Sequence, residues 1–190
     1  MLLHNQIKIF EEFLKDFNIK ITGSFIAKEK KLNQKTVSNY LNKLEKEHIL
    51  KSKTQGKNKL YFLNLDNKEI VKNFIISVEH LRTINFYKKN ILIKEIVGKI
   101  KYHIKGIAVI FGSYTKNTQK KDSDLDVLVI GKCNEKEINN ISKTYKIEIN
   151  LKIYPKLEQD ILTKEVIKNH IIIKNTEQFI EEIWIKLNGV

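Results

Sequence analysis

Two apolar segments joined by a polar loop constrain the fold of this chain more than any other feature. The first, Ile107–Ser113, reads IAVIFGS, and the second, Ser123–Ile130, reads SDLDVLVI. Apolar runs of this length predict buried β-strands. The Gly-Ser pair that ends the first run predicts a sharp turn where backbone amides can approach a ligand, and phosphate is a natural ligand for such a turn.

The second segment carries two carboxylates, Asp124 and Asp126. Because side chains alternate along a strand, both are expected on one face. Carboxylates this close repel each other unless a cation lies between them, and Mg²⁺ prefers oxygen ligands of this kind. A lone Asp-x-Asp is more often a solvated turn, but here the neighbouring strand and its Gly-Ser pair favour a metal site. The pattern indicates Mg²⁺-dependent chemistry on a nucleoside triphosphate.

The stretch from Gly112 to Asp126 resembles the signature of the DNA polymerase β nucleotidyltransferase superfamily, in its minimal prokaryotic branch. The resemblance implies that Gly112 and Ser113 bind the triphosphate, and that Asp124 and Asp126 bind the metal and act in catalysis. After Gly-Ser-Tyr the family often has Ala-Arg-Gly, where this chain has Thr-Lys-Asn. Lys116 keeps the charge and is a third nucleotide-binding candidate, and the asparagine tolerates a left-handed backbone.

The superfamily also uses a third carboxylate, from a later strand, to help activate the attacking hydroxyl. The candidate strand is residues 146–154, in which Glu148 and Asn150 share a face. By position, Asn150 looks like that acid replaced by an amide. Glu148 is the remaining catalytic candidate, but a two-residue step along a strand moves a side chain by roughly 6 to 7 Å. Catalysis tolerates only far smaller displacements than this, so the sequence leaves open whether the protein is catalytically active.

The composition limits the classes of protein to which this chain can belong. A chain of 190 residues with 42% hydrophobic residues predicts one ordinary globular domain or two small ones. No apolar run approaches the roughly 20 residues that span a bilayer, and the first residues lack a signal-peptide core, so we expect a cytoplasmic protein with no membrane partner. The single cysteine, Cys133, permits no intrachain disulfide, and no Cys/His cluster has zinc spacing.

The formal net charge of +13 favours a polyanionic partner, with nucleic acid as the first hypothesis. AT-rich coding would also enrich Lys, Asn and Ile, so the distribution of charge has to decide. Residues 1–65 predict three helices, over about 3–17, around 24–31 and after an N-cap at Asn33, followed by strands at 49–54 and 59–64. This order resembles a winged helix-turn-helix.

Polar side chains cover the outward face of the third predicted helix, and the hairpin is rich in Lys and has no acid from Lys51 to Lys59. Such residues contact phosphates and base edges of double-stranded DNA. Helix-turn-helix domains also serve as protein-binding modules, which is the alternative. The DNA-binding candidates are Gln34, Lys35, Thr36, Ser38, Asn39, Lys43, Lys53 and Lys57.

Residues 66–104 predict a helical linker of two helices. The first has an apolar stripe at Val71, Phe74, Val78 and Leu81, which suits either packing within the monomer or a homodimer. Residues 105–190 then form the predicted nucleotidyltransferase domain, closing with a helix at 157–168, a strand at 170–174 and a helix at 176–187. The expected fold class is α+β, with an N-terminal winged helix-turn-helix and a C-terminal domain built on a small mixed sheet.

The sequence therefore predicts a DNA-binding protein that transfers a nucleotidyl group from a nucleoside triphosphate, ATP first, to an unknown RNA or protein acceptor with Mg²⁺. The alternative is a catalytically degenerate nucleotidyltransferase fold acting as a transcriptional regulator or antitoxin-like repressor. Asn150 favours the alternative, whereas the intact pair of Asp124 and Asp126 opposes it.

Overall fold

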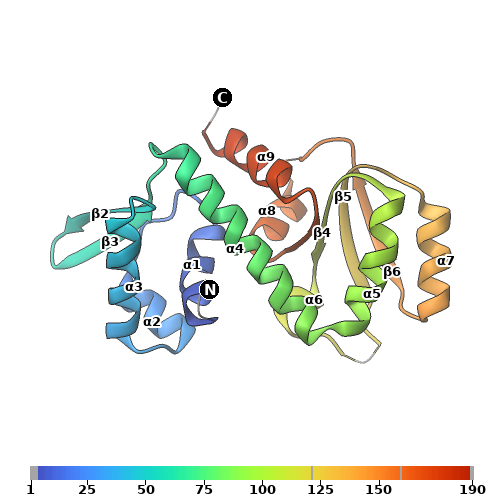
Figure 1. Cartoon of the computed structure of the whole chain (residues 1–190), viewed down its shortest axis with the longest axis horizontal. Helices are drawn as coiled ribbons and strands as arrows, with labels where there is room; N and C mark the ends of the chain where they lie inside the picture. The colour runs from blue at the N-terminus through green and yellow to red at the C-terminus, as the bar shows by residue number, and fades with distance from the viewer. Residues whose placement is uncertain (1–3, 121, 159, 189–190) are drawn as a thin grey trace. The chain divides into compact units, whose positions relative to one another are not determined.

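The computed structural model describes residues 4–120, 122–158 and 160–188. The chain divides into two compact units, residues 1–78 and 79–190, and the division falls inside one long helix, α4 (Lys68–Lys89). Each unit is described by itself (Figure 1). Among the described helices, none combines the length and the apolar character needed to cross a membrane.

The first unit contains three helices and a small antiparallel sheet. Its helices are α1 (His4–Leu14), α2 (Gly23–Lys30) and α3 (Gln34–Lys46). Its strands are β1 (Ile21–Thr22), β2 (Leu50–Gln55) and β3 (Asn58–Leu63), in the spatial order β1-β3-β2. The hairpin β2–β3 pairs in register from Leu50–Leu63 to Gln55–Asn58, as the sequence predicts. The apolar N-terminal half of α4 completes this unit.

Local capping explains where the helices of this unit begin and end. The side chain of Asn33 accepts hydrogen bonds from the backbone N–H groups of Lys35 and Thr36, so the predicted N-cap of α3 is confirmed. The first helix ends at Leu14 rather than at Phe17, because Asp16 forms a turn in which its carboxylate accepts from the N–H of Asn18. The predicted start at residue 3 lies outside the described residues.

The core of the first unit is mainly aliphatic and includes a group of phenylalanine rings. Phe10 and Phe13 of α1 are completely buried, and Phe10 meets Phe74 of α4 edge to face with ring centroids 4.9 Å apart. Val71 and Val78 are also completely buried. These residues of the apolar stripe of α4 therefore pack within the first unit.

The second unit is a four-stranded mixed sheet covered by helices, and it confirms the predicted mixed sheet. Its strands are β4 (Ile104–Phe111), β5 (Leu125–Cys133), β6 (Ile149–Tyr154) and β7 (Ile171–Lys174), in the order β6-β5-β4-β7. Strands β5 and β6 run parallel, and the other pairs run antiparallel. The carboxyl end of β4 therefore lies beside the amino ends of β5 and β6.

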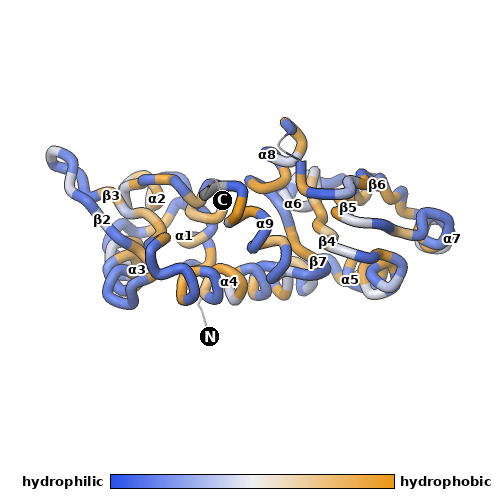
Figure 2. The backbone as a smooth tube through the Cα atoms, turned by 90° about the horizontal axis from the view of Figure 1, so that it is seen from above, coloured by the Kyte–Doolittle hydropathy of each residue, from blue (hydrophilic) through white to orange (hydrophobic). Residues whose placement is uncertain are grey.

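Helices cover both faces of this sheet (Figures 1 and 2). On one face, α5 (Ile91–Ile100) and α7 (Glu135–Tyr145) enclose a core that contains Ile96, Ala108 and Val127. The short 3-10 helix η1 (Lys101–His103) links α5 to β4. On the other face, α9 (Thr176–Asn188) packs against β4, and α8 (Ile161–Lys168) precedes β7. The remaining helix, α6 (Ser113–Lys116), is a single turn after β4.

Three elements of this unit differ from the sequence expectation. Helix α7 was not predicted, although parallel neighbours such as β5 and β6 need a crossover of this kind. Helix α8 begins at Ile161 instead of residue 157, because Asp160 is its N-cap and accepts from the N–H of Thr163 at 2.7 Å. The predicted strand at 146–154 starts only at Ile149, since Lys146 ends α7 in a left-handed conformation.

A buried charged cluster ties α4 to the start of β7 within the second unit. Arg82 Nη1 donates to both carboxylate oxygens of Glu79, at 2.6 and 2.8 Å. Arg82 Nη2 donates to the backbone carbonyl of His170. The imidazole Nε2 of His170 lies 3.5 Å from Glu79 Oε1. Burial raises the pKa of Glu79, but the charges of Arg82 and His170 outweigh it and lower that pKa to about 2.

Several non-glycine residues adopt the left-handed conformation, with φ between 52° and 58°. Three of them end helices, and the others lie in connections between elements. A Cβ atom makes this conformation unfavourable for L-residues other than Asn and Asp. The residues are Lys31, His48, Asn117, Lys146 and Asn175.

Candidate active site and candidate nucleic-acid interface

The turn after β4 requires glycine. Gly112 has φ 75° and ψ −144°, a conformation that side chains rarely permit. A Cβ atom at this position would overlap Oδ2 of Asp126 and lie 3.0 Å from its Cγ. Both constraints hold the turn directly against the carboxylate of Asp126, so the residues that the sequence analysis paired do lie together.

Local hydrogen bonds close the turn. The hydroxyl of Thr115 donates to the carbonyl of Gly112 at 2.9 Å, and the N–H of Thr118 donates to the carbonyl of Ser113 at 3.1 Å. Asn117 ends α6 with φ 54°, so the asparagine does adopt the left-handed conformation expected of it. Ser113 is half-buried and begins α6.

The two aspartates lie at the amino end of β5. Asp126 is in the strand, paired with Phe111 of β4 and with Asn150 of β6, whereas Asp124 precedes the strand. Burial raises the pKa of Asp126, as does the nearby charge of Asp124, and Asn150 and Lys152 partly offset this. The pair is therefore electrostatically unfavourable in the absence of a cation.

Asn150 contacts both aspartates. Its side-chain Nδ2 donates to Oδ2 of Asp124 at 3.2 Å, and its hydrogen bond to Asp126 helps to keep that carboxyl ionised. An amide also has an oxygen that can bind a hard cation. Within the described part of the chain, no group of three or more His, Cys, Asp or Glu residues could hold a metal ion. Two carboxylates and one amide oxygen fit Mg²⁺, which accepts few protein ligands and keeps several waters.

Glu148 takes a different place from Asn150. It directly precedes the first residue of β6, Ile149. Its side chain is exposed, and its backbone carbonyl accepts from the N–H of Leu125 at 2.8 Å. The sequence predicts both residues on one strand, with Asn150 at the position of the third acid and Glu148 two residues before it; in the structure Asn150 is in β6 and Glu148 directly precedes it.

Lys116 and Lys152, near the turn, interact with different carboxylates. Lys116 forms an ion pair with Glu165 of α8 at 2.9 Å, and both side chains are about half exposed. A phosphate contact by Lys116 would compete with that ion pair. Lys152 lies on the same face of β6 as Asn150, two residues further along, and its charge stabilises ionised Asp126. Sequence reasoning missed Lys152, although its i+2 spacing from Asn150 would have pointed to it.

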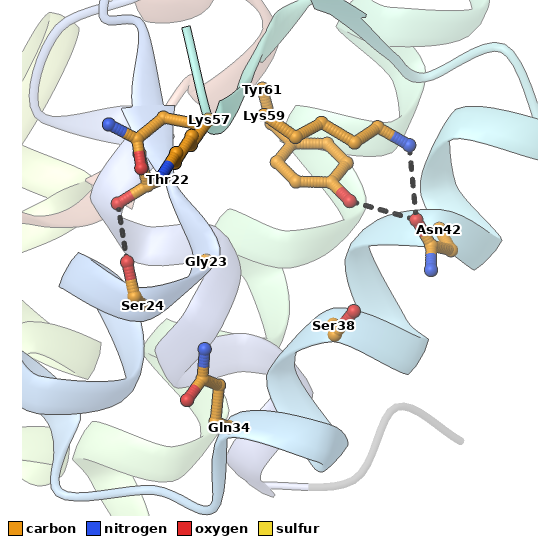
Figure 3. Close-up of a pocket in the computed structure, with 10 residues that line it drawn as sticks. Thr22, Gly23, Ser24, Gln34, Ser38, Asn42, Lys57, Lys59 and Tyr61 are labelled. Atoms are coloured by element: carbon orange, nitrogen blue, oxygen red, sulfur yellow. Dashed lines mark hydrogen bonds between the residues drawn. The ribbon is translucent and has the colours of Figure 1, made fainter. Parts of the chain in front are cut away.

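The first unit has a polar pocket of about 370 Å³ between α3 and the hairpin (Figure 3). Gln34 and Ser38 line it from α3, and Lys57 lines it from the hairpin. Lys59 Nζ and Tyr61 Oη both donate to Oδ1 of Asn42, at 3.3 and 2.8 Å. Thr22, Gly23, Ser24 and Asn58 complete the lining.

The remaining DNA-binding candidates do not all share this pocket. Thr36, Asn39 and Lys43 line a different hollow, of about 330 Å³, beside α1. Lys35 and Lys53 are exposed on α3 and on β2. The candidates on α3 therefore occupy two sides of the helix. Sequence reasoning missed Asn42, which lies four residues after Ser38 and eight after Gln34, a spacing that keeps one helix face.

Comparison with known proteins bears on the second unit. Two proteins of Methanocaldococcus jannaschii, each named "Putative protein adenylyltransferase", are 34% and 35% identical to this chain. The first alignment covers 52% of this chain and 95% of the relative, and the second covers 42% and 76%. A crystal structure of a toxin-antitoxin with AMP-PNP is 18% identical, with a TM-score of 0.39, over 52% of this chain and 82% of that one.

The family profile described as "Nucleotidyltransferase domain" matches residues 91–186. The matched range contains β4, the turn at Gly112, both aspartates and Asn150. It also covers half of the chain. This protein belongs to the nucleotidyltransferase domain family.

Proposed function

We propose that this chain is a Mg²⁺-dependent nucleotidyltransferase that uses ATP and transfers its AMP moiety to a hydroxyl group of a protein. The observation that carries the proposal is the contact between the Gly112 turn and Asp126, with Asp124 and Asn150 at the same sheet edge. The M. jannaschii relatives are named as protein adenylyltransferases, which supports a protein acceptor over RNA.

In the proposed reaction, the acceptor oxygen forms a bond to the α-phosphorus of ATP. The bond between that phosphorus and the bridging oxygen breaks, and pyrophosphate leaves. Mg²⁺ supplies charge neutralisation at the phosphates when it is bound. Asp124 and Asp126 would hold it, and Gly112 leaves the backbone at Ser113 open to phosphate oxygens. Lys152 would face developing negative charge near Asp126.

The acceptor proton needs a base in this scheme. An amide such as Asn150 cannot take it, so Asp126, whose pKa is raised by burial, and Glu148 are the candidate carboxylates. Glu148→Gln separates them. If Glu148 is the base, this variant binds Mg-ATP as the parent does and transfers at least 100-fold more slowly. Full transfer by Glu148→Gln would exclude it.

The second candidate function is a regulator with a degenerate nucleotidyltransferase fold, of the antitoxin-like kind. The amide contact from Asn150 to Asp124, in place of a third acid, favours it. Such a protein binds nucleotide without transferring it. Fold alone does not separate the two functions.

We also propose that residues 1–65 form a winged helix-turn-helix that binds double-stranded DNA, joined by a linker at 66–104 to a nucleotidyltransferase domain at 105–190. Support comes from the order of α2, α3 and the β2–β3 hairpin, and from Lys53 and Lys57. Neither lysine forms an ion pair within the described part of the chain. Gln34 and Ser38 of α3 and Lys57 of the hairpin line one pocket (Figure 3).

The test of the enzyme proposal is transfer of label. The purified chain is incubated with ATP labelled at the α-phosphate, Mg²⁺ and host protein and RNA fractions, and labelled products are resolved before and after protease or nuclease. We expect label on a protease-sensitive product. Asp124→Asn and Asp126→Asn should abolish it, and EDTA should too. Nucleotide binding without transfer to either fraction would favour the regulator, and label only on RNA would reject the protein acceptor.

A further inference from the structure

A further hollow, in the second unit, lies at the end of the sheet opposite the aspartates. It has a volume of about 420 Å³, within the range of small-ligand sites. Register places it well away from the aspartates: Lys105 pairs with Lys132, six steps along the β4–β5 ladder from the Phe111–Asp126 pair. At about 3.4 Å per residue, the separation is roughly 20 Å. Its lining residues are Tyr102, His103, Lys105, Lys132, Cys133 and Asn134.

Two lysines face each other across this hollow. Lys105 and Lys132 are direct partners on antiparallel strands, so their side chains leave the same face with Cβ atoms about 4.5–5.5 Å apart. Like charges opposed in this way are destabilising. Both side chains are exposed, and neither forms an ion pair within the described ranges. No acidic residue lines the hollow, so an anion bound between the lysines would relieve their repulsion.

An exposed aromatic ring adjoins the lysine pair. Tyr102 is 77% exposed, which is unusual for a large aromatic side chain, and Lys101 Nζ lies 5.4 Å from its ring centroid. A ring held at the surface beside cations is the arrangement that stacks a nucleic-acid base while lysines bind its phosphate. His103 adds a hydrogen-bonding ring to the same lining.

We propose that this hollow, the Tyr102–Lys132 pocket, binds a nucleoside phosphate: the base stacks on Tyr102, and the phosphate lies between Lys105 and Lys132. The ligand is either a free nucleotide or a nucleotide of a single strand. Binding here uses lysine charge and needs no metal. It is therefore distinct from the aspartate site, where EDTA leaves two carboxylates that repel phosphate.

The test uses the full-length chain in EDTA. Calorimetry measures the binding of AMP, and fluorescence anisotropy measures the binding of a labelled single-stranded pentanucleotide. The pentanucleotide is titrated in a Lys53→Gln/Lys57→Gln background, which removes the hairpin charges of the first unit. Binding of AMP identifies a free nucleotide as sufficient, and binding of the pentanucleotide alone identifies a strand.

The variants separate stacking from charge. Tyr102→Ala should weaken binding about tenfold, and Tyr102→Phe should restore it, because a base stacks on either ring. Lys105→Gln/Lys132→Gln should weaken binding and reduce its dependence on salt. The matched control, Lys89→Gln/Lys143→Gln, removes the same charge from exposed positions outside the pocket and should bind as the parent does.

Three outcomes would overturn the proposal. The first is that the parent binds neither probe at millimolar concentration. The second is that Tyr102→Ala and the Lys105/Lys132 double variant keep parental affinity. The third is that inorganic pyrophosphate competes fully and Tyr102→Ala has no effect, which would show that no base is recognised. Each result is independent of transfer activity, so it stands whether or not the aspartate site is catalytic.

Discussion

At the scale of single residues, Gly112 is the most constrained position in the candidate active site. Its positive φ and its contact with Asp126 both exclude a side chain. We expect Gly112→Ala to lower the free energy of unfolding by about 1–3 kcal/mol and to abolish Mg-ATP binding, because the turn must move away from Asp126. Urea denaturation and calorimetry measure the two effects.

Gly98 provides the control for this change. It lies inside α5, and a Cβ atom there would meet nothing within 4 Å. Gly98→Ala should therefore raise stability by about 1 kcal/mol through helix propensity and leave nucleotide binding unchanged. If Gly112→Ala behaves like Gly98→Ala in both assays, the turn has no role in the site.

Asn150 is the residue at which the two proposed functions differ. Asn150→Asp puts a third carboxylate beside Asp124 and Asp126, so the variant should be less stable than the parent in EDTA and should gain more stability from Mg²⁺. An enzyme that had lost its third acid should also transfer faster after this change. Thermal unfolding with and without Mg²⁺, together with the transfer assay, measures both. Equal stabilisation of parent and variant by Mg²⁺ would contradict a metal at this position.

Sequence reasoning located the aspartates and the Gly-Ser turn because their chemistry is carried by adjacent residues in two strands. It could not locate the contact of Asn150 with Asp124, which depends on the parallel register of β5 and β6 and on where β6 begins. Nor could it see that Lys116 is paired with Glu165, since the two are 49 residues apart.

At the scale of elements, the cluster of Glu79, Arg82 and His170 couples helix α4 to the α8–β7 junction. The folded-state pKa of Glu79, about 2, is below its ordinary value of 4.5, so the folded state binds fewer protons than the unfolded state. The stabilisation is therefore complete above about pH 4.5 and is lost as the pH falls towards 2. Its size is of the order of a few kcal/mol.

Urea titrations at pH 6, 5, 4 and 3 test this linkage. The second unit of the parent should lose stability steeply below pH 4.5. Glu79→Gln should be less stable at pH 6, since it leaves Arg82 buried without its carboxylate, but should have a flatter pH dependence. Glu95→Gln, at an exposed position of α5, should keep the parental slope. A parental slope in Glu79→Gln would show that the cluster does not govern acid stability.

For the first unit, the prediction concerns DNA binding by lysines of the β2–β3 hairpin. Lys51 pairs with Asp66 and Lys59 with Glu45, whereas Lys53 and Lys57 have no acidic partner among the described residues. Lys53→Gln/Lys57→Gln should weaken binding to every duplex and reduce the salt slope by about 2, because two phosphate contacts are lost. Gln34→Ala should instead relax sequence preference. Anisotropy with several duplexes over a range of salt concentrations measures both, and an unchanged slope would contradict the hairpin as a DNA contact.

Elements with their own stop and start signals were predictable. The Asn33 cap fixed α3, and the glycine-containing turn fixed the hairpin. Helix α7 is not evident from the sequence, because it is short and mostly polar. Its apolar residues Ile138, Ile141 and Tyr145 do recur at helical spacing. The start of α8 was placed too early, since the apolar Leu157 belongs to the preceding loop.

At the scale of the whole molecule, lysine residues in the left-handed conformation lower the free energy of unfolding. Lys31 and Lys146 each end a helix where glycine is usual, at a cost of about 1–2 kcal/mol per residue. Lys31→Gly and Lys146→Gly should each raise the unfolding free energy by up to about 1 kcal/mol, after the greater freedom of glycine in the unfolded chain is subtracted. Thermal unfolding measures the gain, and Lys94→Gly, inside α5, should show a loss instead.

A Lys-rich composition thus does more than set the net charge of +13. It places lysine at helix ends whose geometry suits the residue with no side chain. The chain is consequently less stable than the same fold could be, and the improvement lies at two helix ends, Lys31 and Lys146. A lineage carrying this gene could gain heat tolerance by lysine-to-glycine replacements at these two helix ends.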